Sequence, residues 1–181
     1  MIIRLPHCTV RPWARADAPA LVRHADDREI WRNLRDRFPH PYTAADAEAW
    51  LAFTMQQDPP TQFAIEVDGE AAGSIGYTLG EDVHWRTAEI GYWLGRAVWG
   101  CGIATDALRA VTADAFASHD LDRIQACVFA WNSASVRVLE KAGYEREACL
   151  RRAVTKDGET TDMLIYGILR PGPLAPRPGP A

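Results

Sequence analysis

Apolar residues follow a strand spacing and then a helical spacing near the start of the chain. The alternation over 9–13 predicts a short strand. Asp17, with Pro19 two residues later, predicts a capped helix that continues to Ala25. A second helical piece is expected over 30–34, which contains Ile, Trp and Leu.

A third helix is expected after a stretch that is too rich in proline for regular structure. The segment 38–42 contains two prolines, which argues against both a helix and a central strand. Thr43 followed by Asp46 resembles a capping box, with Asp in place of Glu. We therefore expect a helix that starts there and reaches about residue 55.

The spacing then changes to the alternation of strands. The segment 63–67 alternates apolar with polar or small residues, and the pair Asp68-Gly69 is typical of a hairpin turn. A return strand is expected over 75–79. In the next strand, Ala88–Leu94, the odd-numbered and even-numbered residues face opposite sides of the sheet.

The second half of the chain predicts a strand, a helix and a parallel strand. Ala104, Leu108, Val111 and Ala115 lie on one helical face. The helix connects 88–94 to a strand at 124–130, which makes a βαβ unit. The remaining elements are a helix over 133–142 closed by Gly143, a turn at Asp157-Gly158 and a last strand over 163–169. The fold class is therefore α/β, with a mixed sheet.

The composition fits one globular domain and argues against several classes of partner. The chain has 181 residues, of which 48% are hydrophobic, and a net charge of −4, which disfavours nucleic acid as the main partner. Its four cysteines form no CxxC pair, so neither zinc nor a disulfide framework is expected. No apolar stretch has the length of a signal peptide or membrane span, so we expect a cytoplasmic protein without a membrane partner. The domain is expected to cover 1–170, with a disordered proline-rich tail at 171–181.

The strongest candidate for a ligand site is the turn before the central helix, Trp99 to Thr105. Gly100, Gly102 and Ala104 are small enough for phosphate groups to approach the free amides of a helix N-terminus, and Thr105 adds a hydroxyl. The glycine spacing differs from a dinucleotide fingerprint, and the Gly-Lys-Ser/Thr of a Walker loop is absent. Glycines alone leave open a tight connection that binds no ligand.

Three segments in order resemble the GNAT acetyltransferase superfamily. They are Ala88–Leu94, the turn Trp99–Thr105, and Asn132–Ser135 followed by Leu139–Tyr144. Early Val10–Trp13 and late Asp162–Gly167 are most similar to its RimJ/RimL-like branch, the ribosomal-protein N-terminal acetyltransferases and their relatives. The resemblance covers about 9–170. It implies a sheet whose central parallel strands splay apart around the pantetheine arm of acetyl-CoA.

The resemblance also implies which residues bind acetyl-CoA. Strand residues would pair with the pantetheine amides, the glycine-bearing turn would hold the pyrophosphate, and Asn132 would hydrogen-bond the pantetheine arm. Lys141 either reaches the cofactor or is an ordinary surface lysine. The full set is Tyr92, Trp93, Leu94, Trp99, Gly100, Cys101, Gly102, Ile103, Ala104, Thr105, Asn132, Ser135 and Lys141. No metal is implied.

The chain departs from the family pattern at two positions. Trp99 stands where the glycine signature usually begins with Gln or Arg, and Leu139 stands where many members have a tyrosine that acts as general acid. In the RimL-like branch that role has been given to the serine that corresponds to Ser135, although Ser135 could simply cap a helix. Glu89 is the candidate general base, directly or through water, with a solvated strand carboxylate as the alternative.

The resemblance implies direct attack of a primary amine on the thioester in a ternary complex. A strand amide near Trp93 or Leu94 would stabilise the oxyanion, and Cys101 is too far along the cofactor to act as nucleophile. A protein or peptide N-terminal amine is the favoured acceptor. The alternatives are a small amine, such as a polyamine, an amino acid or an antibiotic, and a CoA-binding sensor without catalysis. Residues 31–42 either shape the acceptor pocket or are ordinary packing, and a homodimer is expected.

Overall fold

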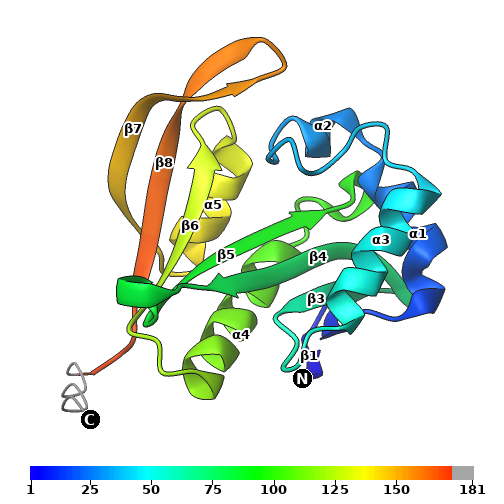
Figure 1. Ribbon diagram of the computed structural model, residues 1–181, viewed down its shortest axis with the longest axis horizontal. Coiled ribbons are helices and arrows are strands. Elements are labelled where there is room, and N and C mark those ends of the chain that lie inside the picture. The colour runs from blue at the N-terminus through cyan, green and yellow to red at the C-terminus, as the bar shows by residue number, and fades with distance from the viewer. Residues whose placement is uncertain (173–181) are drawn as a thin grey trace.

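The computed structural model describes residues 1–172, which form one mixed eight-stranded sheet with helices on both faces (Figure 1). The strand order is β1-β2-β3-β4-β5-β6-β8-β7, and only the β5–β6 pair is parallel. The strands are β1 (Ile3–Arg4), β2 (Thr9–Pro12), β3 (Gln62–Val67), β4 (Glu70–Leu79), β5 (Thr87–Leu94), β6 (Arg123–Phe129), β7 (Glu145–Lys156) and β8 (Glu159–Leu169). The helices are α1 (Ala18–Ala25), α2 (Arg28–Trp31), α3 (Ala44–Met55), α4 (Ile103–Ser118) and α5 (Ser133–Lys141), with short 3-10 turns at Arg15–Asp17, Asp82–His84 and Arg96–Val98.

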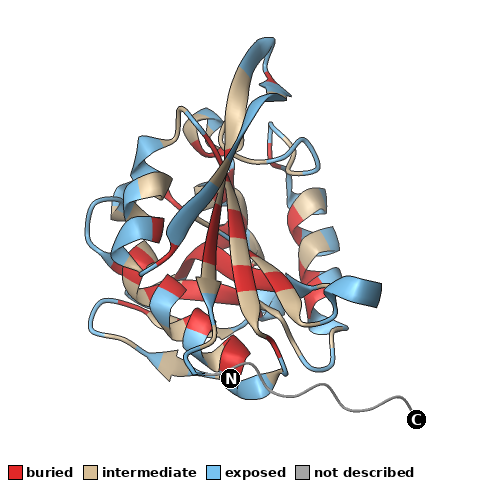
Figure 2. Ribbon diagram, turned by 90° about the vertical axis from the view of Figure 1, so that its left-hand side faces the viewer, coloured by how far each residue is buried: buried red, intermediate tan, exposed pale blue. Residues whose placement is uncertain are grey.

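The two sheet faces have separate cores, as the alternation of the strands requires. Ile75, Tyr77 and Ile90 pack on one face against buried residues of α4 and α5, such as Leu108 and Leu139. On the opposite face, α1 and α3 cover β3 and β4, where the core includes Trp13, Leu21, Leu51 and Ala64. Figure 2 shows this buried interior in the middle of the sheet.

The parallel pair splays apart, as the resemblance implies. Register between β5 and β6 covers Thr87↔Arg123, Ala88↔Ile124 and Glu89↔Gln125, and then ends. β6 instead stays paired with β8 along its whole length, from Arg123 to Phe129. The C-terminal half of β5 therefore has a sheet partner only on its β4 side.

Most predicted elements are confirmed, and the capping box of α3 forms as expected. Thr43 accepts a hydrogen bond from the Asp46 amide, and the Asp46 carboxylate accepts one from the Thr43 amide. The hairpin turn at Asp68-Gly69 has positive φ at both residues, as does the Asp157-Gly158 turn. These local signals are strong because each depends on only a few neighbouring residues.

Four expectations need correction. Asp17 precedes α1 but does not cap it, because its carboxylate binds Arg11 and the Ala14 amide. The second helix ends at Trp31, before Leu34. The last strand begins at 159, four residues earlier than expected, and its partner β7 was not predicted at all.

β7 was missed because it shows no alternation of apolar and polar residues. Almost all of its side chains are exposed or half-buried, and its pairing with β8 is interrupted by two register shifts. It pairs at the sheet edge and extends into a long hairpin with β8 that curves toward α2 (Figure 1). The tail expected at 171–181 lies outside the described residues from 173 onward.

Candidate functional site

A cleft of about 1600 Å³ opens where β5 and β6 separate. It is lined by both strands, by the N-terminal ends of α4 and α5, by part of α3 and by the segment between α2 and α3. Pockets for one small molecule are typically about 300–1,000 Å³. The cleft therefore has room for two reactants.

The open edge of β5 presents backbone groups to this cleft. The Gly95 amide donates to the Ala72 carbonyl of β4 at 2.7 Å. Because backbone groups alternate sides along a strand, the amides of Tyr92 and Leu94 point into the gap. The Leu94 carbonyl is already used, since it accepts the indole N–H of Trp99 at 2.7 Å. The indole thus fixes the turn that leads to α4 and leaves the Leu94 amide for a ligand.

The turn before α4 is shaped to admit a ligand. Gly100 and Gly102 have φ of +79° and +81°, and a β-carbon at either position would meet no atom within 4 Å. Gly102 is the N-cap of α4 and supplies no side-chain acceptor, whereas Thr43 and Asn132 cap α3 and α5. The first amides of this 16-residue helix are therefore open at the cleft, where their partial positive charge favours an anion.

The structure brings all but one of the expected cofactor residues to the same cleft. Its walls include Tyr92, Trp93, Leu94, Trp99, Gly100, Gly102, Ile103, Ala104, Thr105, Asn132, Ser135 and Lys141. Cys101 is exposed and lines a smaller pocket with Leu5 and His7 instead. Lys141 is exposed at the end of α5, where the Arg109 guanidinium donates to its carbonyl.

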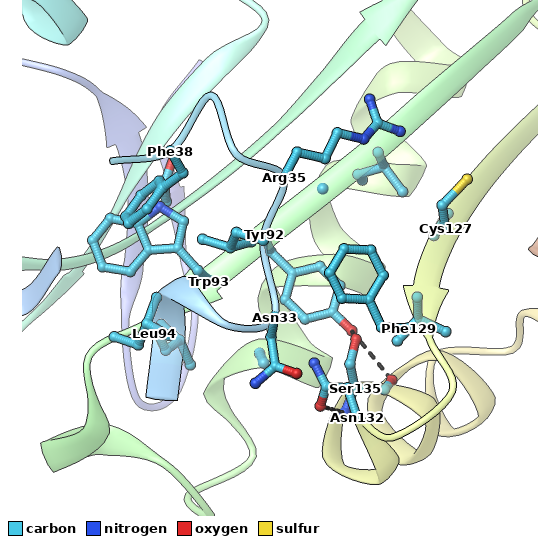
Figure 3. A pocket seen from close by; sticks show the side chains of 18 of the residues that line it. Asn33, Arg35, Phe38, Tyr92, Trp93, Leu94, Cys127, Phe129, Asn132 and Ser135 are labelled. Carbon is cyan, nitrogen blue, oxygen red and sulfur yellow. Dashed lines mark hydrogen bonds between the residues drawn. The ribbon is translucent and has the colours of Figure 1, made fainter. Parts of the chain in front are cut away.

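The helix-capping role that was one of the two alternatives for Ser135 is filled by Asn132. The Asn132 side-chain oxygen accepts the Ser135 amide at 3.0 Å, so Asn132 caps α5 and Ser135 does not. The Ser135 hydroxyl lies 2.8 Å from the Tyr92 hydroxyl, as Figure 3 shows. Burial raises the pKa of Tyr92 to about 12, against a smaller opposing effect of the Ser135 hydrogen bond. The phenol therefore keeps its proton at neutral pH, and the two hydroxyls form a donor pair on the wall of the cleft.

Glu89 lies in the cleft at the point where the parallel strands separate. Arg35, from the segment between α2 and α3, donates to its Oε1 atom, and the Cys127 thiol lies 3.8 Å from its Oε2 atom. Burial, followed by the Glu89 charge, raises the pKa of Cys127, so this thiol is not an activated nucleophile. Glu89 is thus a carboxylate whose present partner is a cation.

The segment between α2 and α3, here called the α2 loop (residues 32–43), is attached across the cleft. The Trp131 indole donates to the Asn33 side chain at 3.1 Å. Lys156, at the end of β7, donates to Asp36 at 2.7 Å and lies 3.8 Å above the Trp31 ring. Because Lys156 is only 3% exposed, its cation–π contact is largely desolvated. The loop is therefore held against the β7–β8 hairpin on one side and the start of α5 on the other.

Replacing Lys156 with Met should release the α2 loop while leaving the fold intact. Met keeps most of the buried volume but loses the charge that binds Trp31 and Asp36. We expect a loss of about 2 kcal/mol, which corresponds to a fall in Tm of about 4–8 °C for a chain of this size. Trypsin should then cleave faster at Arg35 and Arg37.

Arg28→Gln is the matched control for this variant. It removes an ion pair with Asp157 at the same hairpin turn, but both side chains are exposed, at 62% and 43%. Such pairs contribute little, so its Tm and its trypsin sensitivity should stay near wild type. If the two variants had the same Tm and the same rate of cleavage by trypsin, Lys156 would not be what holds the loop.

Sequence reasoning missed the long-range partners in this site. Arg35 and Glu89 are 54 positions apart, and Asp36 and Lys156 are 120 apart, so no local pattern connects them. The phenol of Tyr92 was also missed as a partner of Ser135. Leu139, at the position where many family members have a tyrosine, is 1% exposed in the core.

Among residues 1–172, no group of three or more His, Cys, Asp or Glu side chains is arranged to hold a metal ion. No helix within the same residues has both the length and the apolar character needed to cross a bilayer.

Comparison with known proteins places the chain in a family. The family model described as "Acetyltransferase (GNAT) domain" matches residues 7–145. An uncharacterized N-acetyltransferase p20 of Bacillus licheniformis is 28% identical over 165 residues, which cover 90% of this chain and 92% of that protein. The ribosomal-protein-serine acetyltransferase of Escherichia coli (strain K12) is 32% identical over 104 residues, 58% of each chain. Alignments with some other curated relatives span about half of those proteins, 57% and 48% in two cases.

The fold agrees with this assignment. The structure of Mycobacterium smegmatis RimJ in complex with CoA-disulfide has a TM-score of 0.80 and 27% identity, covering 93% of this chain and 86% of that one. The mixed α/β architecture of the chain is thus shared with a known acetyltransferase structure. The chain therefore belongs to the GNAT acetyltransferase family of N-acetyltransferases and resembles its RimJ/RimL-like members.

Proposed function

We propose that this protein transfers the acetyl group of acetyl-CoA to the N-terminal amine of a protein or peptide. The observation that carries the proposal is the single cleft that joins the open α4 N-terminus, the unpaired edge of β5 and Glu89. An anionic, extended co-substrate fits the first two features, and an amine that must lose a proton fits the third. Support for a protein acceptor comes from relatives such as the ribosomal-protein-serine acetyltransferase.

The residues suit the binding of acetyl-CoA from its pyrophosphate to its thioester. The α4 amides at Ile103–Thr105 would bind the pyrophosphate, with Gly100 and Gly102 leaving space for it. The edge of β5 would pair with the pantetheine amides like an added strand. Nδ2 of Asn132 supplies donors at the same wall, since its oxygen caps α5.

Three groups are proposed to act in the reaction as general base, oxyanion donor and general acid: Glu89, the Leu94 amide and Ser135. Glu89 accepts a proton from the incoming ammonium, directly or through water, and the neutral amine then attacks the thioester carbonyl. The Leu94 amide, which points into the gap, is better placed to stabilise the oxyanion than the Trp93 amide, which belongs to the β4 ladder. As the C–N bond forms and the C–S bond breaks, the Ser135–Tyr92 hydroxyl pair protonates the leaving thiolate.

A turnover assay with an acceptor panel tests the function. Purified protein is given acetyl-CoA with amidated peptides, polyamines, free amino acids or aminoglycosides, and products are identified by mass spectrometry. Acetylation of a peptide α-amine, with small amines at least about tenfold slower in kcat/KM, supports the proposal. Turnover only with small amines would overturn the choice of acceptor. Release of CoA with none of them would favour a sensor.

Replacing Ser135 with Ala should slow turnover with little effect on acetyl-CoA affinity. A thiolate is a good leaving group, so we expect a loss of about 10- to 100-fold, at the low end for a positioned acid. Tyr92→Phe should give a similar loss, and the double variant should lose little more, because both hydroxyls belong to one donor pair. The measurement is kcat, from steady-state kinetics, for the wild type, the two single variants and the double variant. Independent, multiplicative losses would contradict a shared role.

The homodimer expected from the resemblance and the cytoplasmic location both stay predictions.

A further inference from the structure

The ion pair between Arg35 and Glu89 is placed where the acceptor amine must bind. Arg35 donates to Oε1 of Glu89, the carboxylate proposed to take the proton. The two side chains are 51% and 35% exposed, so the pair faces the open part of the cleft. An incoming ammonium therefore competes with a guanidinium for the same carboxylate.

Arg35 is held in place by its neighbours in the chain, whereas its own half-exposed side chain contacts only the rim of the cleft at Glu89 and Cys127. The neighbouring Asn33 and Asp36 are bound by Trp131 and Lys156, which fixes the α2 loop on both sides of Arg35. The long side chain between these anchors can turn from Glu89 to another anion without moving the loop.

The α2 loop brings positive charge to the cleft at this point, although one of its arginines, Arg32, is paired with Glu159. The sequence of the α2 loop from 32 to 37 contains three arginines and one aspartate, and all four line the cleft. The aspartate, Asp36, is paired with Lys156, so it does not neutralise Arg35. A guanidinium is well matched to a carboxylate, with which it forms paired, charge-assisted hydrogen bonds.

We propose that Arg35 selects acceptors that carry a carboxylate next to the reacting amine, as in a peptide with an acidic second residue. This inference rests on the proposed function. The acceptor carboxylate replaces Glu89 as the partner of Arg35, and Oε1 of Glu89 becomes free to take the ammonium proton. Neighbouring Cα atoms are about 3.8 Å apart, which keeps the carboxylate of residue two close to the amine of residue one. Binding of the acceptor carboxylate to Arg35 therefore also frees Glu89 from its ion pair with Arg35.

The test compares two amidated peptides that differ only in charge, Ser-Glu-Ala-Ala and Ser-Gln-Ala-Ala, with free serine as a third acceptor. The wild type should acetylate the Glu peptide with a kcat/KM at least about tenfold higher than the Gln peptide. Arg35→Gln should bring the two peptides within about twofold. It should also change kcat/KM for the Gln peptide much less than kcat/KM for the Glu peptide, because only the Glu peptide loses a binding partner.

Arg15→Gln is the charge-matched control, since Arg15 is exposed in the turn before α1 and does not line the cleft. It should keep the wild-type preference. Equal use of both peptides by the wild type, or an equal loss on both in Arg35→Gln, would overturn the role of Arg35 while leaving the proposed function intact. Acetylation of free serine but of neither peptide would overturn the proposed peptide acceptor, and with it the acidic second residue as the group that Arg35 selects.

Discussion

Replacing Ala104 with Glu should abolish most of the affinity for acetyl-CoA without unfolding the protein. Ala104 is in the first turn of α4 and lines the cleft, so the new carboxylate would lie among the amides proposed to bind the pyrophosphate. Two like charges about 4 Å apart repel by about 4 kcal/mol near a protein surface, and salt reduces this further. We therefore expect Kd to rise by about 30-fold or more, or about 2 kcal/mol, in calorimetric titration.

The choice of Ala104 avoids a difficulty at the glycines of the same turn. Gly102 has φ of +81°, so a side chain there would strain the backbone and could weaken binding for a trivial reason. At Ala104 the backbone is already helical, and an acidic residue in the first turn favours the helix. The Tm of the free variant should accordingly stay at or slightly above that of the wild type.

Ala104→Gln is the matched control because it adds nearly the same volume without charge. Its Kd should rise only a few-fold, and saturating acetyl-CoA should still raise its Tm, whereas the Glu variant should show almost no shift at the same concentration. If both variants bind as tightly as the wild type, the pyrophosphate does not lie on the α4 amides.

The sequence predicts the central part of the fold well because its signals are local. The Thr43–Asp46 capping box, the Asp68-Gly69 turn and the apolar face of α4 each depend on residues within one or a few turns. The splay of β5 and β6 is different. Nothing in the two strand sequences shows that pairing stops after Glu89, and only the resemblance to a family indicated it.

The residues of the proposed cofactor side could be predicted for the same reason, and those of the proposed acceptor side could not. Gly100, Gly102 and the start of α4 are contiguous in the chain. Around Glu89, by contrast, the contacts come from Arg35 on the α2 loop and Cys127 on β6. These segments meet only after the whole sheet has formed, so side-chain spacing along the sequence gives no information about them. β7 lacks a periodic signal because it is an exposed edge strand.

The pairing with Arg35 changes how the proposed base must be viewed. Alone, Glu89 could be read as a solvated carboxylate on a strand. In the structure it is half-buried at the end of the parallel ladder, and its partner is a cation carried by a loop that borders the cleft. An ion pair that only stabilised the α2 loop could lie anywhere on the surface that the loop contacts, and would not need to lie at the end of the parallel ladder. Because Glu89 lies where β5 and β6 separate, its carboxylate is proposed to accept a proton from the reacting amine once Arg35 has turned away.

Replacing Glu89 with Gln should lower turnover by about 100- to 10,000-fold, which is the usual contribution of a positioned base. Gln keeps the size and the hydrogen-bonding capacity of Glu but cannot accept the ammonium proton. Acetyl-CoA should bind nearly as tightly as in the wild type, because Glu89 lies beyond the edge of β5 that is proposed to bind the pantetheine arm. The loss should therefore be found in kcat and kcat/KM. Single-turnover kinetics should show the same loss in the rate constant of the chemical step.

The pH dependence distinguishes a base from a structural carboxylate. A peptide α-amine has a pKa of about 7.7–8.0, so the fraction that arrives already deprotonated rises as pH increases from 6 to 9. The deficit of Glu89→Gln should consequently shrink with rising pH, whereas a purely structural defect would stay constant. Glu89→Asp is the matched control, because it keeps the charge on a shorter side chain and should recover part of the activity. A Gln variant within about threefold of wild type at neutral pH, with chemistry rate-limiting, would be too active for a lost base. Glu89 would then serve only to hold Arg35 and the α2 loop.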